Sequence, residues 1–240
     1  MDVPHWFMHV TEENPTNLHP HLEKTPRFRY RPLAELRAAR KPRHLARFAI
    51  DGGQFLKYRF LRGRPLIKDP LALFSSDWLA SEFEMDVVLL VRHPAAFAAS
   101  LRRLGYRHPF SDFVRQPPLM RDHLGPCERD IRAIEEARGV LDEAALLWRI
   151  ITSMTLAFRE PHPDRSFYRY GDLINDPATR FGAMFERLQL PFASQIRDRI
   201  VRSAEPNLLG WKVRVPEDEI ARSRARVAGH RSSLYPVKDL

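Results

Sequence analysis

The stretch VVLLVRHPAAFAASLRRLGY, residues 87–106, decides the fold of this chain. Its run of branched apolar residues is typical of a strand that is covered on both faces of a parallel sheet. Pro94 suits the first turn of a helix, and the alanine-rich segment after it predicts a helix over 94–104. The stretch therefore predicts a buried strand, a turn at Arg92 and a helix.

The rest of the chain repeats this alternation of apolar runs and amphipathic helices. Residues 65–69 and 166–170 are expected to form two further strands. Helices are expected over 70–83, 128–138, 141–160, 177–190, 194–204 and 216–229, and residues 42–65 are typical of a helical stretch that two glycines interrupt. Strands that alternate with helices predict an α/β fold with a mostly parallel central sheet, in a single domain spanning 1–240.

The composition indicates a globular protein with a basic surface. The chain has 240 residues, 39 Lys+Arg against 30 Asp+Glu, a net charge of +9 and 44% hydrophobic residues. No apolar run approaches the ~20 residues of a membrane span, and no signal peptide is expected at the start. Cys127 is the single cysteine, so we expect no internal disulfide and a cytoplasmic setting. The excess of basic residues fits either an anionic partner or a solvated surface, whereas the dispersed arginines do not favour nucleic acid.

Three cationic or polar side chains are expected at one edge of the sheet. Ligands of parallel α/β sheets bind beyond the carboxyl ends of the strands, where Lys68, Arg92 and Tyr170 fall. An arginine in front of a helix N-terminus can bind a phosphate through two donors, and the Ser100 hydroxyl could reach the same phosphate. The alternatives are that Arg92 pairs with an acid and that Ser100 is only a small packing residue.

The segment VRHPAAFAAS resembles the 3′-phosphate-binding segment of sulfotransferases that use 3′-phosphoadenosine 5′-phosphosulfate (PAPS). In that family an arginine at a strand end and a serine eight residues later hold the 3′-phosphate. Arg92 and Ser100 have this spacing. The resemblance implies that these two residues bind the cofactor, with PAPS as co-substrate and no metal.

Three further segments extend the resemblance over roughly residues 65–220. RPLIKDPLALFSSDWL is similar to a segment of tyrosylprotein sulfotransferases and their bacterial relatives whose lysine assists transfer, which implies a catalytic Lys68. FYRYGDLINDP is similar to a segment whose tyrosine lies near the adenine, which implies a role for Tyr170. NLLGWKVRVPEDEI resembles a segment that closes over the nucleotide, which implies Trp211 and Lys212. The alternatives are an exposed lysine in a turn and ordinary core aromatics.

The general base is the least defined part of the expected site. Many cytosolic sulfotransferases have a histidine two residues after this lysine, where the present chain has Pro70. HVTEENP resembles a segment of tyrosylprotein sulfotransferases whose second glutamate is the base, which implies Glu13. Asp69 and His93 are weaker candidates, and Glu13 could also be a solvated loop acid.

One segment of the family is missing from this sequence. Members begin with a strand and a loop such as P-R-S-G-T-T that cradles the 5′-phosphosulfate, and no such loop is present in the printed sequence. The expected fold is therefore a three-layer fold like that of P-loop NTPases, in an N-terminally incomplete domain without its first strand and phosphate loop. We expect an enzyme that transfers a sulfuryl group to a hydroxyl or amine of a sugar, lipid, peptide or other small acceptor. This chain alone is expected to be impaired. The alternative is an inactive remnant that only binds an anion or nucleotide.

Overall fold

The computed structural model describes residues 5–12, 14, 53, 56–57, 60–61, 63–134, 139–163, 165–204 and 221. Its strands β1 (Val88–Val91) and β2 (Ser166–Arg169) pair in parallel, so that Val91 lies opposite Arg169. In these described ranges the sheet consists of this one pair. The α/β class expected from the sequence is confirmed at this coarse level.

Helix α5 (Pro94–Leu104) follows β1 and has the bounds that the sequence predicts. His93 caps its N-terminus, because the ring Nδ1 accepts a hydrogen bond from the Ala95 N–H at 3.2 Å. Gly105 ends the helix with a φ of 60°, a left-handed conformation that glycine adopts without the clash of a Cβ atom. Local signals at both ends therefore define this helix.

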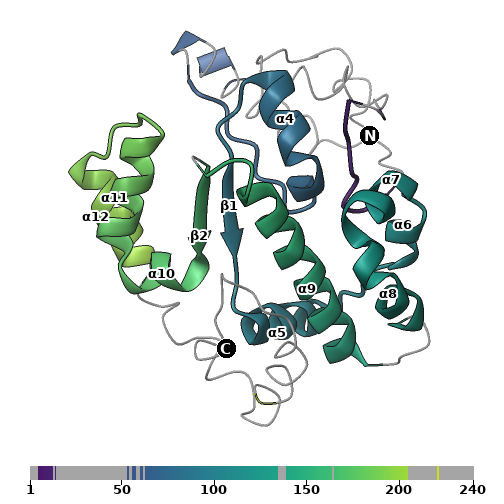
Figure 1. Cartoon of the computed structure of the whole chain (residues 1–240). Helices are drawn as coiled ribbons and strands as arrows, with labels where there is room; N and C mark the ends of the chain where they lie inside the picture. The colour runs from purple at the N-terminus through teal and green to yellow at the C-terminus, as the bar shows by residue number, and fades with distance from the viewer. Residues whose placement is uncertain are drawn as a thin grey trace.

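Helix α9 (Val140–Arg159) is the long central helix of the molecule. It runs beside the sheet and crosses α5, as Figure 1 shows. Small buried residues on α5, among them Ala95 and Ala98, allow the two helices to approach closely. The buried side chain of Trp148 on α9 packs against Val91 of β1. This packing fixes the end of β1 relative to α5 and α9.

The remaining helices surround the sheet and α9 (Figure 1). Near the amino ends of the strands lie η1 (Ala72–Ser75) and α4 (Ser76–Phe83), and beyond β2 lie α10 (Tyr170–Asn175), α11 (Pro177–Arg187) and α12 (Ser194–Ala204). The opposite flank holds α6 (Ser111–Val114), α7 (Pro117–Leu119), the π-helix η2 (Met120–Leu124), η3 (Gly125–Cys127) and α8 (Glu128–Ile134). None of the helices in the described ranges has the length and apolar character to cross a bilayer.

The main hydrophobic core lies between α9, η1 and the helices of this flank. Its buried members come from residues 5–12 and from helices and their caps along the chain: Phe7, Phe74, Phe110, Phe113, Leu119, Leu124, Ile131, Leu146, Leu147, Ile150, Met154 and Phe158. Residues 5–12 are fastened to this core by polar contacts of their backbone. For example, the His9 N–H donates to the Gln116 side chain at 2.8 Å. Residues 5–12 therefore pack as part of the protein body.

Two expectations about strands are wrong. Residues 65–69 form no strand, and Leu66 is 89% exposed. Pro65 has no N–H to donate to a sheet, and the Arg64 side chain is bonded to Asp86 and to the Leu188 carbonyl instead. Strand β1 is also not covered on both faces, because Leu90 is 52% exposed.

The other expected elements are confirmed or lie outside the described residues. The helices predicted over 70–83, 141–160, 177–190 and 194–204 and the strand over 166–170 are present with shifts of a few residues. The helix predicted over 128–138 is described as far as Ile134. The helix predicted over 216–229 and most of the stretch 42–65 lie outside the described residues. The short helices between 111 and 127 were not expected.

Candidate functional site

Arg92 and Tyr170 lie side by side at the carboxyl edge of the sheet. Each follows the last residue of a strand, and the register of the parallel pair places these two strand ends next to each other. The Arg92 guanidinium carbon lies 5.3 Å from the centroid of the Tyr170 ring. At this distance the cation is attracted to the face of the ring, which orients the guanidinium.

The charge of Arg92 is not neutralised by an acid in the described part of the chain. Its side chain is exposed, and no carboxylate there forms an ion pair with it. Arg169 on the neighbouring strand behaves differently, because its Nε donates to the Asp172 carboxylate at 2.8 Å. Of these two arginines, Arg92 is therefore the one with donors available for an anionic ligand.

Helix α5 begins two residues after Arg92 and directs its N-terminal end toward the same edge. This end carries the positive pole of the helix dipole. Ser100 lies six residues into α5, about 9 Å along the axis from Pro94. It is half-buried, and no hydrogen bond joins it to Arg92. The fold thus brings Arg92, Tyr170 and the start of α5 together, and it places Ser100 farther along the helix.

Lys68 occupies a different setting from the one predicted. It is exposed on the irregular segment 63–69 and follows no strand, so water screens its charge. Its neighbour Asp69 accepts a hydrogen bond from the Leu71 N–H at 2.8 Å and so stabilises the turn before η1. His93, a weaker candidate for the base, serves as the cap of α5. Asp69 and His93, the two weaker candidates for the base, thus form local hydrogen bonds at the starts of helices.

Three of the predicted site residues lie outside the described residues: Glu13, Trp211 and Lys212. Glu12, the neighbour of Glu13, is described and lines a cavity.

This cavity of about 890 Å³ lies at the amino edge of the sheet. Val87 and Ser166, at the starts of the two strands, both line it, together with residues of α4 and of the segment 9–12. Neither Arg92 nor Tyr170 lines it. A four-residue strand is about 13 Å long, so the cavity and the Arg92 edge are separate places on the molecule.

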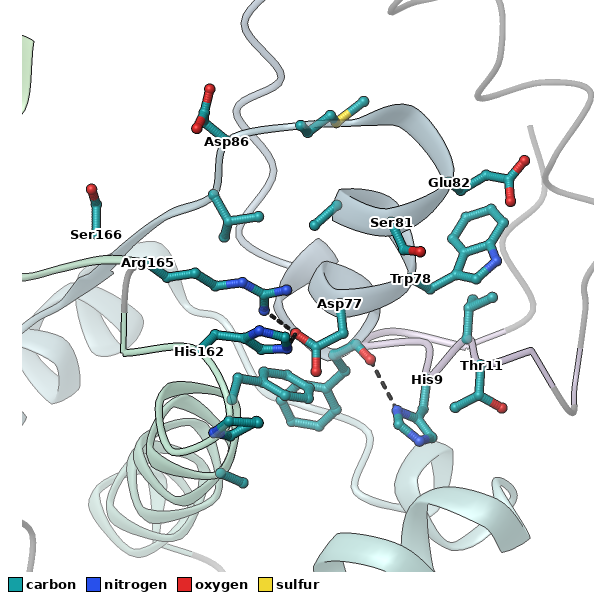
Figure 2. A pocket seen from close by; sticks show the side chains of 18 of the residues that line it. His9, Thr11, Asp77, Trp78, Ser81, Glu82, Asp86, His162, Arg165 and Ser166 are labelled. Carbon is teal, nitrogen blue, oxygen red and sulfur yellow. Dashed lines mark hydrogen bonds and ion pairs between the residues drawn. The ribbon is translucent and has the colours of Figure 1, made fainter. Parts of the chain in front are cut away.

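The polar lining of the cavity centres on Asp77. Figure 2 shows the side chains of Arg165 and His162 turned toward the Asp77 carboxylate. Arg165 is hydrogen-bonded to it, and His162 Nε2 lies 3.8 Å from it. On another wall the His9 ring Nδ1 lies 2.9 Å from the Phe74 carbonyl oxygen. Arg165 balances the charge of Asp77, but four further carboxylates line the cavity against one further arginine, so the lining as a whole has an excess of acidic side chains.

His123 packs against His9 in the lining of the cavity. The rings of His9 and His123 meet edge to face with their centroids 5.1 Å apart. Burial lowers the pKa of His123 below its ordinary value of 6.5, and the nearby His9 lowers it further. Asp122 and Asp77 oppose this lowering of the pKa without reversing it. No group of three or more His, Cys, Asp or Glu side chains in the described residues could hold a metal ion.

Sequence reasoning missed the cavity and the support of Arg92 by Trp148. The cavity residues come from segments scattered over the chain, and no spacing in the sequence marks them. The Trp148 indole N–H donates to the Arg92 carbonyl oxygen at 2.8 Å, although the two residues lie far apart in sequence. The sequence shows only a tryptophan within an apolar helix. Because this pattern is typical of any hydrophobic core, it does not indicate a contact with Arg92.

Comparison of the chain with protein-family models, with curated proteins and with solved structures gives no match.

Proposed function

We propose that this chain is a PAPS-dependent sulfotransferase that binds the nucleotide at the carboxyl edge of its sheet. The observation that carries the proposal is the contact between Arg92 and Tyr170 at adjacent strand ends, in front of the α5 N-terminus. An exposed guanidinium without a carboxylate partner in the described residues favours a ligand with a phosphate group. The resemblance of VRHPAAFAAS to the 3′-phosphate segment of these enzymes supports the same ligand.

In this proposal Arg92 binds the 3′-phosphate of PAPS with two N–H donors. Tyr170 holds the guanidinium from one side and lies near the adenosine. Ser100 adds a hydroxyl donor to the phosphate. Trp211 and Lys212 contact the nucleotide from the C-terminal part of the chain. The finer fold is part of the proposal, namely a three-layer arrangement like that of P-loop NTPases with β1 and β2 in a larger parallel sheet.

The proposed reaction moves a sulfuryl group from PAPS to an acceptor hydroxyl or amine. The bond between sulfur and the bridging phosphate oxygen breaks, and a bond between sulfur and the acceptor atom forms. Glu13 takes the acceptor proton, and Lys68 stabilises the charge on the departing adenosine 3′,5′-bisphosphate. No metal takes part. The acceptor is a glycan, lipid, peptide or other small molecule in the cytoplasm, and nucleic acid is not a partner.

The setting of Lys68 favours a second candidate function. Lys68 was expected directly after a buried strand, but it is exposed on an irregular segment. A protein that binds the nucleotide through Arg92 without transferring the sulfuryl group would fit this setting. The two candidates share the nucleotide site and differ only in the transfer step.

Calorimetry with adenosine 3′,5′-bisphosphate tests the shared nucleotide site. Removing a charged hydrogen-bond partner typically costs about 2 kcal/mol, so Arg92→Ala is expected to weaken binding by about thirtyfold. Arg103→Ala is the matched control, since Arg103 is exposed at the opposite end of α5, and it is expected to bind as the wild type does. Equal affinities of wild type and Arg92→Ala would contradict the site.

An assay of sulfuryl transfer separates the two candidate functions. With PAPS and a panel of sugars, lipids and tyrosine peptides, Lys68→Ala is expected to lower the rate and to leave nucleotide affinity unchanged, because the ammonium group stabilises the charge that develops on the departing phosphate. Lys57→Ala, at another exposed lysine, serves as the control. A wild type that binds the nucleotide but transfers to no acceptor would favour the binding protein.

A further inference from the structure

Trp148 is buried directly beneath the turn that carries Arg92. Its side chain is 2% exposed and packs against Val91, the last residue of β1, and against Ala145. Its indole Nε1–H donates to the Arg92 carbonyl oxygen at 2.8 Å. The indole N–H is a donor only, so a buried tryptophan needs such an acceptor. The bond therefore ties α9 to the backbone of the strand end.

This hydrogen bond constrains the direction of the Arg92 side chain. The peptide group after Arg92 is planar, so fixing its carbonyl oxygen also fixes the backbone torsion of Arg92. Side chains alternate between the two faces at a strand end. Val91 packs on Trp148, and the next side chain is directed the other way, over the Tyr170 ring. A phenylalanine at position 148 would fill the same space but could not hold this carbonyl.

We propose that Trp148 is a positioning residue of the anion site, which acts through the Arg92 backbone and does not touch the ligand. This inference rests on the proposed function, because it assumes that Arg92 binds the 3′-phosphate of a nucleotide. The positioning role proposed for Trp148 depends on its indole N–H. Without that donor the turn at Arg92 samples more conformations. Binding of the phosphate then costs the guanidinium more conformational entropy.

The test compares two nucleotides on the wild type and on Trp148→Phe. The variant is expected to bind adenosine 3′,5′-bisphosphate about tenfold more weakly, the effect of losing one hydrogen bond that orients a ligand group. Its affinity for adenosine 5′-monophosphate, which lacks the 3′-phosphate, is expected to stay the same. Equal losses for both nucleotides, or no loss for either, would overturn the inference.

A double mutant distinguishes positioning from general packing. If Trp148 acts only through Arg92, Arg92→Ala/Trp148→Phe binds adenosine 3′,5′-bisphosphate as weakly as Arg92→Ala alone. A further loss in the double mutant would show that Trp148 supports the site by another route and would contradict the proposal. A wild type that binds neither nucleotide would overturn the proposed function and this inference with it.

The wild-type protein provides a second readout in case Trp148→Phe does not fold. In protein labelled with ¹⁵N-tryptophan, the indole N–H signal of Trp148 is expected to shift on addition of adenosine 3′,5′-bisphosphate. Replacing Trp6, Trp78 and Trp211 one at a time assigns the signal by elimination. The same addition to Arg92→Ala is expected to leave it unmoved. An unmoved signal in the wild type saturated with nucleotide would overturn the inference.

Discussion

At the scale of single residues, His108 is an ionisable side chain inside an aromatic cluster. It is buried, and its ring centroid lies 4.5 Å from that of Phe113 and 5.1 Å from that of Phe110. Burial lowers the pKa of His108 from 6.5 to about 4, although nearby Asp112 and Glu143 oppose this shift. The folded protein therefore keeps this ring neutral under conditions in which the unfolded chain protonates it.

This burial predicts a loss of stability in mild acid. Because the unfolded state binds the proton of His108 near pH 6.5 and the folded state only near pH 4, stability is complete above pH 6.5 and falls as the pH decreases through this window. The loss attributed to this residue between pH 7.5 and pH 5 is about 2 kcal/mol. Urea unfolding of the wild type and of His108→Phe at both pH values measures it.

The variant keeps a ring in the cluster and removes the titrating group. It is expected to lose about 2 kcal/mol less than the wild type over the same interval, since the unfolded chain no longer gains a proton at this position. Parallel pH dependence of the two proteins would contradict the assigned role of His108.

At the scale of elements, residues 5–12 are held to the body through Gln116. Its Oε1 accepts from the His9 N–H at 2.8 Å, and its Nε2 donates to the Phe7 carbonyl at 3.4 Å and to the Asp112 carbonyl at 2.9 Å. Gln116 is buried, so these backbone groups have little access to water. One side chain thus replaces the hydrogen bonds that a neighbouring strand would provide.

Gln116→Ala is expected to lower the free energy of unfolding by about 1–3 kcal/mol, because it leaves buried backbone groups without a partner. Hydrogen exchange of a peptide covering residues 5–12 is expected to speed up more than exchange elsewhere. Gln195→Ala, at an exposed position on α12, is the control and should change neither quantity. Unchanged protection of residues 5–12 in Gln116→Ala would show that the segment is held by other contacts.

Elements with strong local signals could be predicted from the sequence, and elements that depend on distant contacts could not. Pro94 and Gly105 mark the two ends of α5, so its bounds were predicted correctly. The apolar run 65–69 looked like a strand, but a strand also needs a hydrogen-bonding neighbour, and no strand in the described residues pairs with this run.

The short helices between 111 and 127 show the same dependence on distant contacts. Prolines and a glycine interrupt this stretch and favour loops in the sequence. In the structure its polar side chains bind the N-terminal segment, as when Asp112 accepts from the Trp6 N–H at 2.9 Å. Tertiary bonds of this kind stabilise helices that are too short to be stable alone.

At the scale of the whole molecule, the topology of the sheet explains which part of the site could be predicted. Arg92 and Tyr170 were expected at one edge because carboxyl ends of parallel strands lie together, and the structure places them in contact. The expected position of Lys68 depended on a strand that does not form. The cavity around Asp77 depends on the packing of segments that only the folded chain brings together.

The proposed nucleotide site and the cavity are therefore separate places on the molecule. The carboxyl edge carries Arg92 and the start of α5, whereas the amino edge carries the cavity lined by Asp77, His162 and Arg165. A nucleotide with a 3′-phosphate is expected at the first place, because Arg92 has no carboxylate partner in the described residues whereas Arg165 is already bonded to Asp77.

A crystal structure of the chain with adenosine 3′,5′-bisphosphate tests the proposed nucleotide site most directly. We expect an oxygen of the 3′-phosphate within about 3 Å of a guanidinium nitrogen of Arg92, with the adenosine beside Tyr170. A nucleotide bound in the cavity next to Arg165, or anywhere with Arg92 out of reach of its phosphates, would contradict the proposal.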